Sequence, residues 1–281
     1  MPEPLPPLPP SFFDAYTPDQ MALRVEKVGM IKADLPAQPL FALAFLAGAF
    51  IALGAMFFTV AITGSHLGFG PTRVLGGVAF SLGLILVVVG GAELFTGNVL
   101  MAMGWADRKV TTRALLRNWG MAYAGNFAGA AAMAVLAHGA GLYALDSGQV
   151  GETARRIAEA KAALPFGAAF WKGVLCNTLV CLAVWLCFAA HSVVDKIFAI
   201  VFPITAFVAL GFEHSIANMY FIPAGALAGG IETGVLRALV ANLVPVTLGN
   251  IVGGGVFVAA AYYVIYLRGR KRDGKGEGAR R

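Results

Sequence analysis

Two short polar stretches, residues 91–98 and 211–218, interrupt long apolar blocks and hold the side chains most able to do chemistry. The first contains Glu93, and the second contains Glu213 and His214. A charged side chain at the centre of a bilayer costs about 2.5 kcal/mol or more, so an ionisable residue there indicates a function. His214 is the foremost candidate, because an imidazole titrates near neutral pH and can exchange a proton with a weak acid beside it.

Each of these residues also has a structural interpretation. His214 could do no more than hydrogen-bond the interrupted helix, and Thr96 could either hold that imidazole or cap its own helix. We expect Glu93 and Glu213 to be structural and to accept backbone N–H bonds at the interruptions, with a proton relay as the alternative.

Lys172 and Asn177 belong to a further apolar block at residues 166–190. Lys172 either extends to water near the external surface or raises the local anion concentration at a pore entrance. Asn177 lies five residues deeper, and we expect it to face the same cavity.

Apolar side chains near the first interruption could close a path. Phe80 and Leu84 are four residues apart and share a helix face, while Leu94 and Phe95 lie in the interruption itself. Ordinary packing is the alternative for all four. An anion stripped of water is strongly disfavoured in a dry constriction, whereas its protonated form is not, so a proton donor would decide what passes.

The elements that must position these residues are membrane-spanning helices. The chain is 58% hydrophobic and 13% charged, against about 25% charged residues in an average soluble domain. Its apolar residues form blocks of more than about 20 residues, the length that crosses a hydrocarbon layer of about 30 Å. We predict an all-α integral membrane protein with six spans, at residues 41–63, 74–103, 119–142, 166–190, 197–229 and 238–267.

The two halves of the chain repeat one another. Gly, Glu and Asn of residues 91–98 recur in residues 211–218 at an offset of 120. The segment from Asn118 to Asn126 is matched by the segment from Asn242 to Asn250 at an offset of 124. Because each half has three spans, the halves must face opposite ways. We therefore predict inverted three-helix repeats whose second and fifth helices are broken, a plan that places the substrate path at the breaks.

The ends of the chain are more polar. We divide it into a segment with an amphipathic helix at residues 1–35, a membrane domain at 36–267 and a basic tail at 268–281. Thr17 and Gln20 form the pattern of a capping box at the start of that helix. Of the 21 Lys and Arg residues, 15 fall on the side that holds both termini, which predicts cytoplasmic termini. The tail is therefore read as a topology signal, and we expect no nucleic-acid partner.

Metal and cofactor chemistry is not indicated. Cys176, Cys181 and Cys187 all fall in one apolar block, where we expect them to pack as small apolar residues. We expect neither a bound metal nor a cofactor.

Residues 211–220, Gly-Phe-Glu-His-Ser-Ile-Ala-Asn-Met-Tyr, closely resemble the signature of the formate/nitrite transporter family. Residues 93–98, 176–185 and 242–255 are similar to further parts of that family, and the similarity extends from about residue 17 to residue 267.

The resemblance implies an aquaporin-like protomer with its own pore, assembled as a homopentamer in a bacterial inner membrane. It implies that His214 and Thr96 face each other at the pore centre, with Lys172 and Asn177 nearby and the N-terminal helix as a candidate gate. It also implies two constrictions, an external one of Phe80, Phe95 and Phe207 and a cytoplasmic one of Leu84 and Leu94.

Transport of small monovalent anions is the function that these features favour, with formate first and nitrite or hydrosulfide as alternatives. We expect protons and membrane lipid to be the other partners. Passive and proton-linked passage both stay open. A water or glycerol channel is disfavoured because the paired Asn-Pro-Ala breaks of that group are absent. A membrane-embedded enzyme using Glu213 and His214 as acid and base is a remote alternative, and we expect no enzyme.

Overall fold

The computed structural model describes residues 15–268, and all of its regular elements are helical. The proline-rich start and most of the basic tail, which the sequence analysis assigned to the two ends, lie outside the described residues. The main helices are α1 (Pro18–Asp34), α2 (Ala37–Ile62), α3 (Phe69–Gly90), α4 (Phe95–Asn98), α5 (Ala102–Ala106), α6 (Thr112–Gly139), α7 (Gln149–Ala162), α8 (Phe166–Cys187), α9 (Val193–Ala209), α10 (Ser215–Gly229) and α11 (Val235–Val252).

Five of the helical segments in the described part of the chain are long and apolar enough to cross a membrane. They are α2, α3, α6, α8 and the segment Val235–Leu267, in which α11 continues through the π-helical stretches η4 (Gly253–Ala260) and η5 (Tyr263–Leu267). The predicted span at residues 197–229 is divided between α9 and α10, each of which is shorter than one crossing. The predicted all-α membrane fold with broken helices is confirmed.

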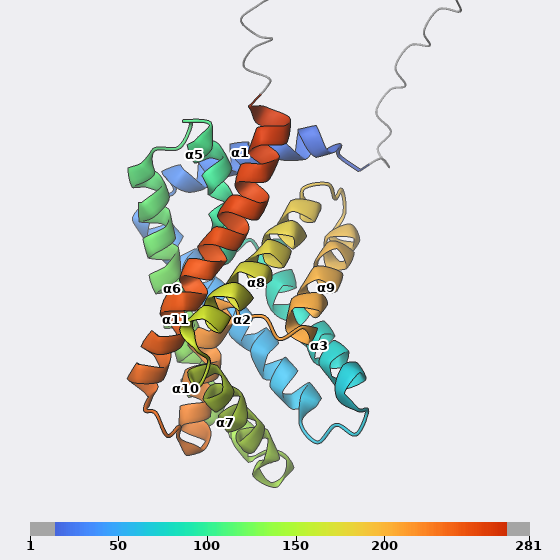
Figure 1. Cartoon of the computed structure of the whole chain (residues 1–281), viewed down its shortest axis with the longest axis vertical. Helices are drawn as coiled ribbons and strands as arrows, with labels where there is room; N and C mark the ends of the chain where they lie inside the picture. Colours follow the sequence, from blue (N-terminus) through green and yellow to red (C-terminus); the bar gives the residue numbers. More distant parts are fainter. Residues whose placement is uncertain (1–14, 269–281) are drawn as a thin grey trace, which may run out of the picture.

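The helices form an elongated bundle, with α1 lying across one end and the short helix α7 at the opposite end (Figure 1). At one end α1 packs against α5 and the 3-10 turn η1 (Val99–Met101), and at the other end α7 packs against α10. Helix α7 was not predicted. Its signal was the alternation of Val150, Ala154 and Ala158, which are buried, with charged residues on the opposite face.

Glycines let the spanning helices approach closely. A Cβ atom on Gly129 of α6 would lie 2.0 Å from the carbonyl oxygen of Phe45 in α2, and one on Gly253 would lie 2.1 Å from that of Val174 in α8. Without hydrophobic gain between helices in lipid, such backbone proximity is a main source of packing energy. The pair α2 with α6 and the pair α8 with α11 are thus built in the same way in the two halves.

The two halves meet at equivalent positions. The hydroxyl of Tyr123 in α6 lies 2.9 Å from that of Thr247 in α11, and these residues are separated by the repeat offset of 124. The pseudo-twofold axis that relates the halves therefore passes close to this contact.

Helix α1 is fixed to the bundle by buried charges. The Nζ atom of Lys109 lies 2.5 Å from a carboxylate oxygen of Glu26 in α1 and 3.2 Å from one of Asp107, and both carboxyl groups are buried. Burial raises the pKa of the Glu26 carboxyl despite the opposing effect of its hydrogen bond with Lys109. That hydrogen bond in turn raises the pKa of Lys109. The cluster joins α1 to the segment that connects α5 and α6.

Candidate functional site

Each helix break begins at a glycine in a left-handed conformation. Gly91 follows α3 with a φ of 79°, and Gly211 lies two residues after the end of α9 with a φ of 73°. Glycine adopts such angles without the penalty that a Cβ atom brings. Non-helical residues follow, and the chain resumes as α4 at Phe95 and as α10 at Ser215.

A buried asparagine from α6 holds the first break. Asn126 accepts a hydrogen bond from the Phe95 N–H (2.9 Å) and donates to the carbonyls of Ala44 (2.7 Å) and Glu93 (3.0 Å). Its side chain therefore replaces hydrogen bonds that a continuous helix would have made. Backbone freed in this way is tolerated at membrane depth only when such partners satisfy it.

Asn250 of α11 does the same for the second break. It accepts from the Ser215 N–H (3.0 Å) and donates to the carbonyls of Gly173 (2.8 Å) and Glu213 (3.0 Å). The two asparagines are separated by 124 residues, so the offset seen in the sequence reflects identical hydrogen bonding at the two breaks.

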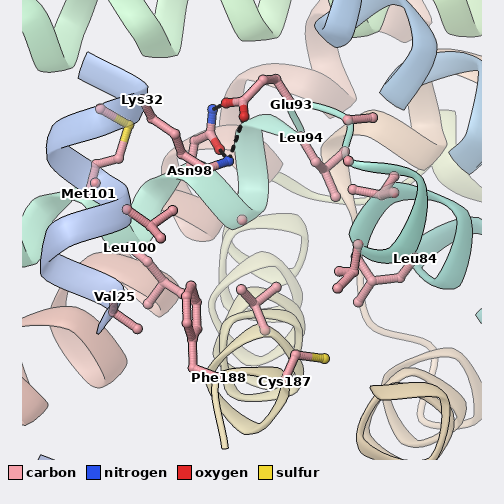
Figure 2. A pocket seen from close by; sticks show the side chains of 18 of the residues that line it. Val25, Lys32, Leu84, Glu93, Leu94, Asn98, Leu100, Met101, Cys187 and Phe188 are labelled. Carbon is pink, nitrogen blue, oxygen red and sulfur yellow. Dashed lines mark hydrogen bonds and ion pairs between the residues drawn. The ribbon is translucent and has the colours of Figure 1, made fainter. Parts of the chain in front are cut away.

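Glu93 lies in the first break and binds side chains. Its carboxylate accepts from the Nζ of Lys32 in α1 (2.8 Å) and from the amide of Asn98 (2.7 Å) (Figure 2). Asn98 also donates to Asn118 (2.9 Å) and accepts from Lys32 (2.8 Å). The expectation that this carboxylate accepts backbone N–H bonds is wrong, because among the described residues its partners are an ammonium and an amide.

Glu213 repeats this network at the second break. Each of its carboxylate oxygens lies 3.1 Å from the Nζ of Lys161 in α7, and one of them accepts from Asn218 (2.6 Å). Asn218 also donates to Asn242 (2.7 Å). The expectation of backbone donors is wrong here too, for the same reason: a lysine from outside the spanning helices reaches the carboxylate and neutralises it.

Lys32 and Lys161 belong to the candidate site through these ion pairs and were not predicted from the sequence. They are 129 residues apart, an offset different from the 120 and 124 of the predicted repeats, because the connections between the elements differ in length in the two halves. The same offset of 129 relates Leu43 to Lys172, whose carbonyls accept from the N–H groups of Glu93 and Glu213 at 3.2 and 3.3 Å. A search for a third offset could have found them.

His214 and Thr96 meet between the two breaks. The Nε2 atom of His214 lies 2.9 Å from the hydroxyl oxygen of Thr96, and both side chains are buried. The Nδ1 atom of the same ring accepts a hydrogen bond from the Ala217 N–H (3.1 Å) and so caps α10. A neutral imidazole that accepts at Nδ1 carries its proton on Nε2, so this hydrogen bonding places an N–H donor toward Thr96.

Two cavities approach this pair from opposite ends and share no lining residue. We call them the α1-side vestibule, of about 330 Å³, and the α7-side vestibule, of about 440 Å³. Figure 2 shows the first, with Lys32, Glu93 and Asn98 on one side and Leu84 and Leu94 on the other. Lys161, Glu213 and His214 line the second.

The predicted constriction residues divide between the vestibules. Leu84 and Leu94 line the α1-side vestibule, whereas Phe80 and Phe207 line the α7-side vestibule, with ring centroids 5.6 Å apart. Phe95 lines neither vestibule, and its ring packs on Trp119 and Tyr123 instead. The ring of Phe80 packs against the rings of Phe58, Phe207 and Phe221.

Lys172 and Asn177 do not share one cavity. Lys172 lines the α7-side vestibule. Asn177 is fully buried, lines neither vestibule, and donates to the carbonyls of Thr96 (3.2 Å) and Asn250 (2.7 Å). The asparagine thus joins the two breaks and fixes Thr96 in place.

The described residues contain no group of three or more His, Cys, Asp or Glu side chains that could hold a metal ion. The three cysteines are buried within the bundle, and the sulfur of Cys181 lies 3.3 Å from the Thr96 carbonyl oxygen. The chemistry of this site therefore rests on one imidazole, one hydroxyl and two lysine–glutamate pairs.

Comparisons with known proteins agree with this geometry. Residues 19–264 match the sequence model of the formate/nitrite transporter family. The formate channel FocA of Escherichia coli (strain K12) is 40% identical over 274 residues, which cover 91% of this chain and 96% of FocA. A probable formate transporter of Methanothermobacter thermautotrophicus is also 40% identical, over 90% of this chain and 97% of its own length.

Solved structures show the same fold. A structure described as a pentameric formate channel with formate bound superposes with a TM-score of 0.75 at 42% identity, covering 83% of this chain and 98% of the other. A structure described as an ion channel of the same family superposes with a TM-score of 0.78 at 28% identity, covering 88% and 98%.

Proposed function

Because the chain belongs to the formate/nitrite transporter family, a family of transporters and not of enzymes, we propose that it carries formate through a pore in each protomer. Nitrite and hydrosulfide are the alternative substrates. The observation that carries the proposal is the His214–Thr96 contact of 2.9 Å between two vestibules, each of which ends in apolar side chains.

Electrostatics and burial support a passage that depends on protonation. Leu84, Phe80 and Phe207 are each no more than 3% exposed. A bare anion among such side chains is strongly disfavoured, while neutral formic acid is a small polar molecule that they tolerate. His214 is the titratable group placed at this barrier, with Nε2 as the nitrogen that can face the substrate.

Proton transfer at His214 is coupled to the end of α10. The charged ring carries a proton on both nitrogens, so its formation requires Nδ1 to release the Ala217 N–H. The proton that charges the ring comes from water, and the charged ring can then give its Nε2 proton to a formate oxygen, which yields neutral formic acid and a neutral ring protonated at Nδ1. The neutral acid leaves through the apolar segment. The resting tautomer returns when Nδ1 loses its proton to water and Nε2 takes one up, so that Nδ1 again accepts from the Ala217 N–H.

The similarity to FocA of Escherichia coli supports a bacterial inner membrane location. The distribution of Lys and Arg supports cytoplasmic termini, so the α1-side vestibule opens to the cytoplasm and the α7-side vestibule to the outside. The relative described as a pentameric formate channel supports assembly of five copies, each with its own path.

Stopped-flow flux measurements in proteoliposomes test the function. We expect formate flux in the wild type, with nitrite and hydrosulfide compared at two pH values. His214→Asn should lower formate flux by about tenfold or more, because it removes the proton donor while keeping a side chain that can cap a helix. His138→Asn, at an exposed histidine outside both vestibules, is the matched control and should behave as the wild type. Equal formate flux in His214→Asn and the wild type would reject a proton role.

A further inference from the structure

Each vestibule is lined by three basic residues and one carboxylate. Arg24, Lys32 and Lys196 line the α1-side vestibule with Glu93, and Arg73, Lys161 and Lys172 line the α7-side vestibule with Glu213. Lys32 and Lys161 are paired with those carboxylates. The net positive charge of the outer, α7-side vestibule therefore comes from Arg73 and Lys172.

Arg73 is held in one orientation at the end of α9. Its Nε atom donates to the carbonyl of Ala209 (2.9 Å) and its Nη2 atom to the carbonyl of Val208 (2.8 Å). The carboxyl end of a helix carries partial negative charge on carbonyls that have no helical partner. Both carbonyl-bearing residues line the same vestibule as Phe207 and His214. Without Arg73, this end of α9 would repel an anion directly before the apolar barrier.

We propose that Arg73 is a specificity-determining residue that receives planar anions with two oxygens, such as formate and nitrite, at the outer mouth. A guanidinium group is planar and has two edges that can each donate a pair of parallel N–H bonds. The edge formed by Nε and Nη2 is used on α9. Nη1 makes no hydrogen bond with any described residue, so the edge formed by Nη1 and the second N–H of Nη2 is left for a ligand, and Arg73 lines the vestibule.

The free edge can bind both oxygens of a carboxylate or nitrite group at once, whereas chloride and hydrosulfide each offer a single acceptor atom. Two parallel charge-assisted bonds give both energy and a preferred plane, whereas an ammonium acts as a point charge. Lys172 in the same vestibule and Lys196 at the other mouth supply charge without this geometry. The inference rests on the proposed function, since it assigns the residue that distinguishes formate and nitrite from hydrosulfide on entry from outside.

Comparison of Arg73→Lys, Arg73→Gln and Lys172→Gln tests this role by flux in proteoliposomes at low substrate concentration. Arg73→Lys should lower the ratio of formate to hydrosulfide flux by about three- to tenfold, because it keeps the charge and loses the fork. Arg73→Gln should lower both the ratio and the absolute fluxes. Lys172→Gln should lower all anion fluxes by a common factor, most strongly at low salt, and leave the ratio unchanged. An unchanged ratio in Arg73→Lys would overturn the proposal.

Size-exclusion chromatography would show whether the Arg73 variants assemble. If they do not, competition experiments on the wild-type protein test the same assignment. External pivalate, a carboxylate too bulky to pass, should compete with formate uptake, whereas chloride at the same concentration should not. Equal inhibition by the two would overturn the assignment. Absence of formate flux in the wild type would instead reject the proposed function, so the two failures are distinguishable.

Discussion

At the scale of single residues, the most constrained side chains are those of Asn126 and Asn250. Each is fully buried, binds one N–H and one carbonyl group at a helix break, and donates to a carbonyl of a neighbouring spanning helix. A buried backbone group left without a partner costs about 1–3 kcal/mol. The breaks thus depend on an amide that both donates and accepts, a combination that neither Asp nor Leu provides.

We expect Asn126→Leu and Asn250→Leu each to lower stability by about 2 kcal/mol or more, because two backbone groups at the break lose their partner and a third hydrogen bond to a neighbouring helix is lost. Thermal denaturation in detergent, followed by light scattering, would measure the loss. Asn177→Leu is the comparison variant. It removes two hydrogen bonds where the other variants remove three, so its loss of stability should be smaller. Melting temperatures equal to that of the wild type in all three variants would show that other contacts hold the breaks.

Residue chemistry was only partly predictable from the sequence. The types and spacing of residues 91–98 and 211–218 identified the breaks and made a contact between Thr96 and His214 one of two interpretations. That the two face each other was implied by the resemblance to the family. The partners of Glu93 and Glu213 did not follow from the offsets of 120 and 124, because each carboxylate meets a lysine more than 50 residues away on a short helix at an end of the bundle. Those two helices are related by the different offset of 129.

At the scale of helices, glycine positions differ sharply in what surrounds them. Gly129 of α6 faces α2 in backbone contact, whereas Gly120 of the same helix has no atom within 4 Å of the position of a Cβ. Both are helical and neither has a positive φ. They therefore separate the effect of helix packing from that of glycine in a helix.

Gly129→Ala should push α2 from α6 and lower both stability and flux, because the new methyl would have to lie 2.0 Å from a backbone oxygen. Gly120→Ala should be neutral or stabilise by up to about 1 kcal/mol, as expected from helix propensity. Melting temperature and formate flux of the two variants would be compared. Wild-type stability in Gly129→Ala would contradict the packing described for the two helices.

The sequence predicted that the second and fifth spans are broken, and the structure divides both of them. The predicted span at residues 74–103 ends as α3 at Gly90 and resumes in short pieces, and the span at 197–229 divides into α9 and α10. Residues 92–94 and 212–214 are buried or half-buried in protein, so the chain can stay apolar where it is not helical. Hydropathy alone therefore does not show where these helices end, whereas the glycine and asparagine positions do.

At the scale of the whole molecule, α1 is joined to the bundle by ion pairs as well as by apolar packing. The ion pairs join Glu26 to Lys109 and Lys32 to Glu93, and the buried apolar face of α1 packs on the bundle. The Glu26 pKa is raised above its ordinary value of 4.5, chiefly by burial. A group that binds its proton more readily in the docked state favours docking below its ordinary pKa and loses that contribution as pH rises through the raised pKa.

We therefore expect protection of the α1 amides from hydrogen exchange, corrected for intrinsic rates, to decrease as pH rises through the pKa of Glu26. The pKa of Lys109 is raised from 10.5, so its contribution is constant in this range and is lost only above it. Glu26→Gln should remove the dependence in the acidic range. The same pH profile in Glu26→Gln and the wild type would show that another group controls the attachment of α1.

Close to the contact between Tyr123 and Thr247, each half of the protein touches its own counterpart. The two breaks, their asparagines and their lysine–glutamate pairs are duplicated about this axis, so they look alike from either end of the path. Only the parts without a counterpart can make the two ends different. The imidazole of His214, which corresponds to Leu94 in the first half, and the guanidinium group of Arg73 bound to α9 are such parts.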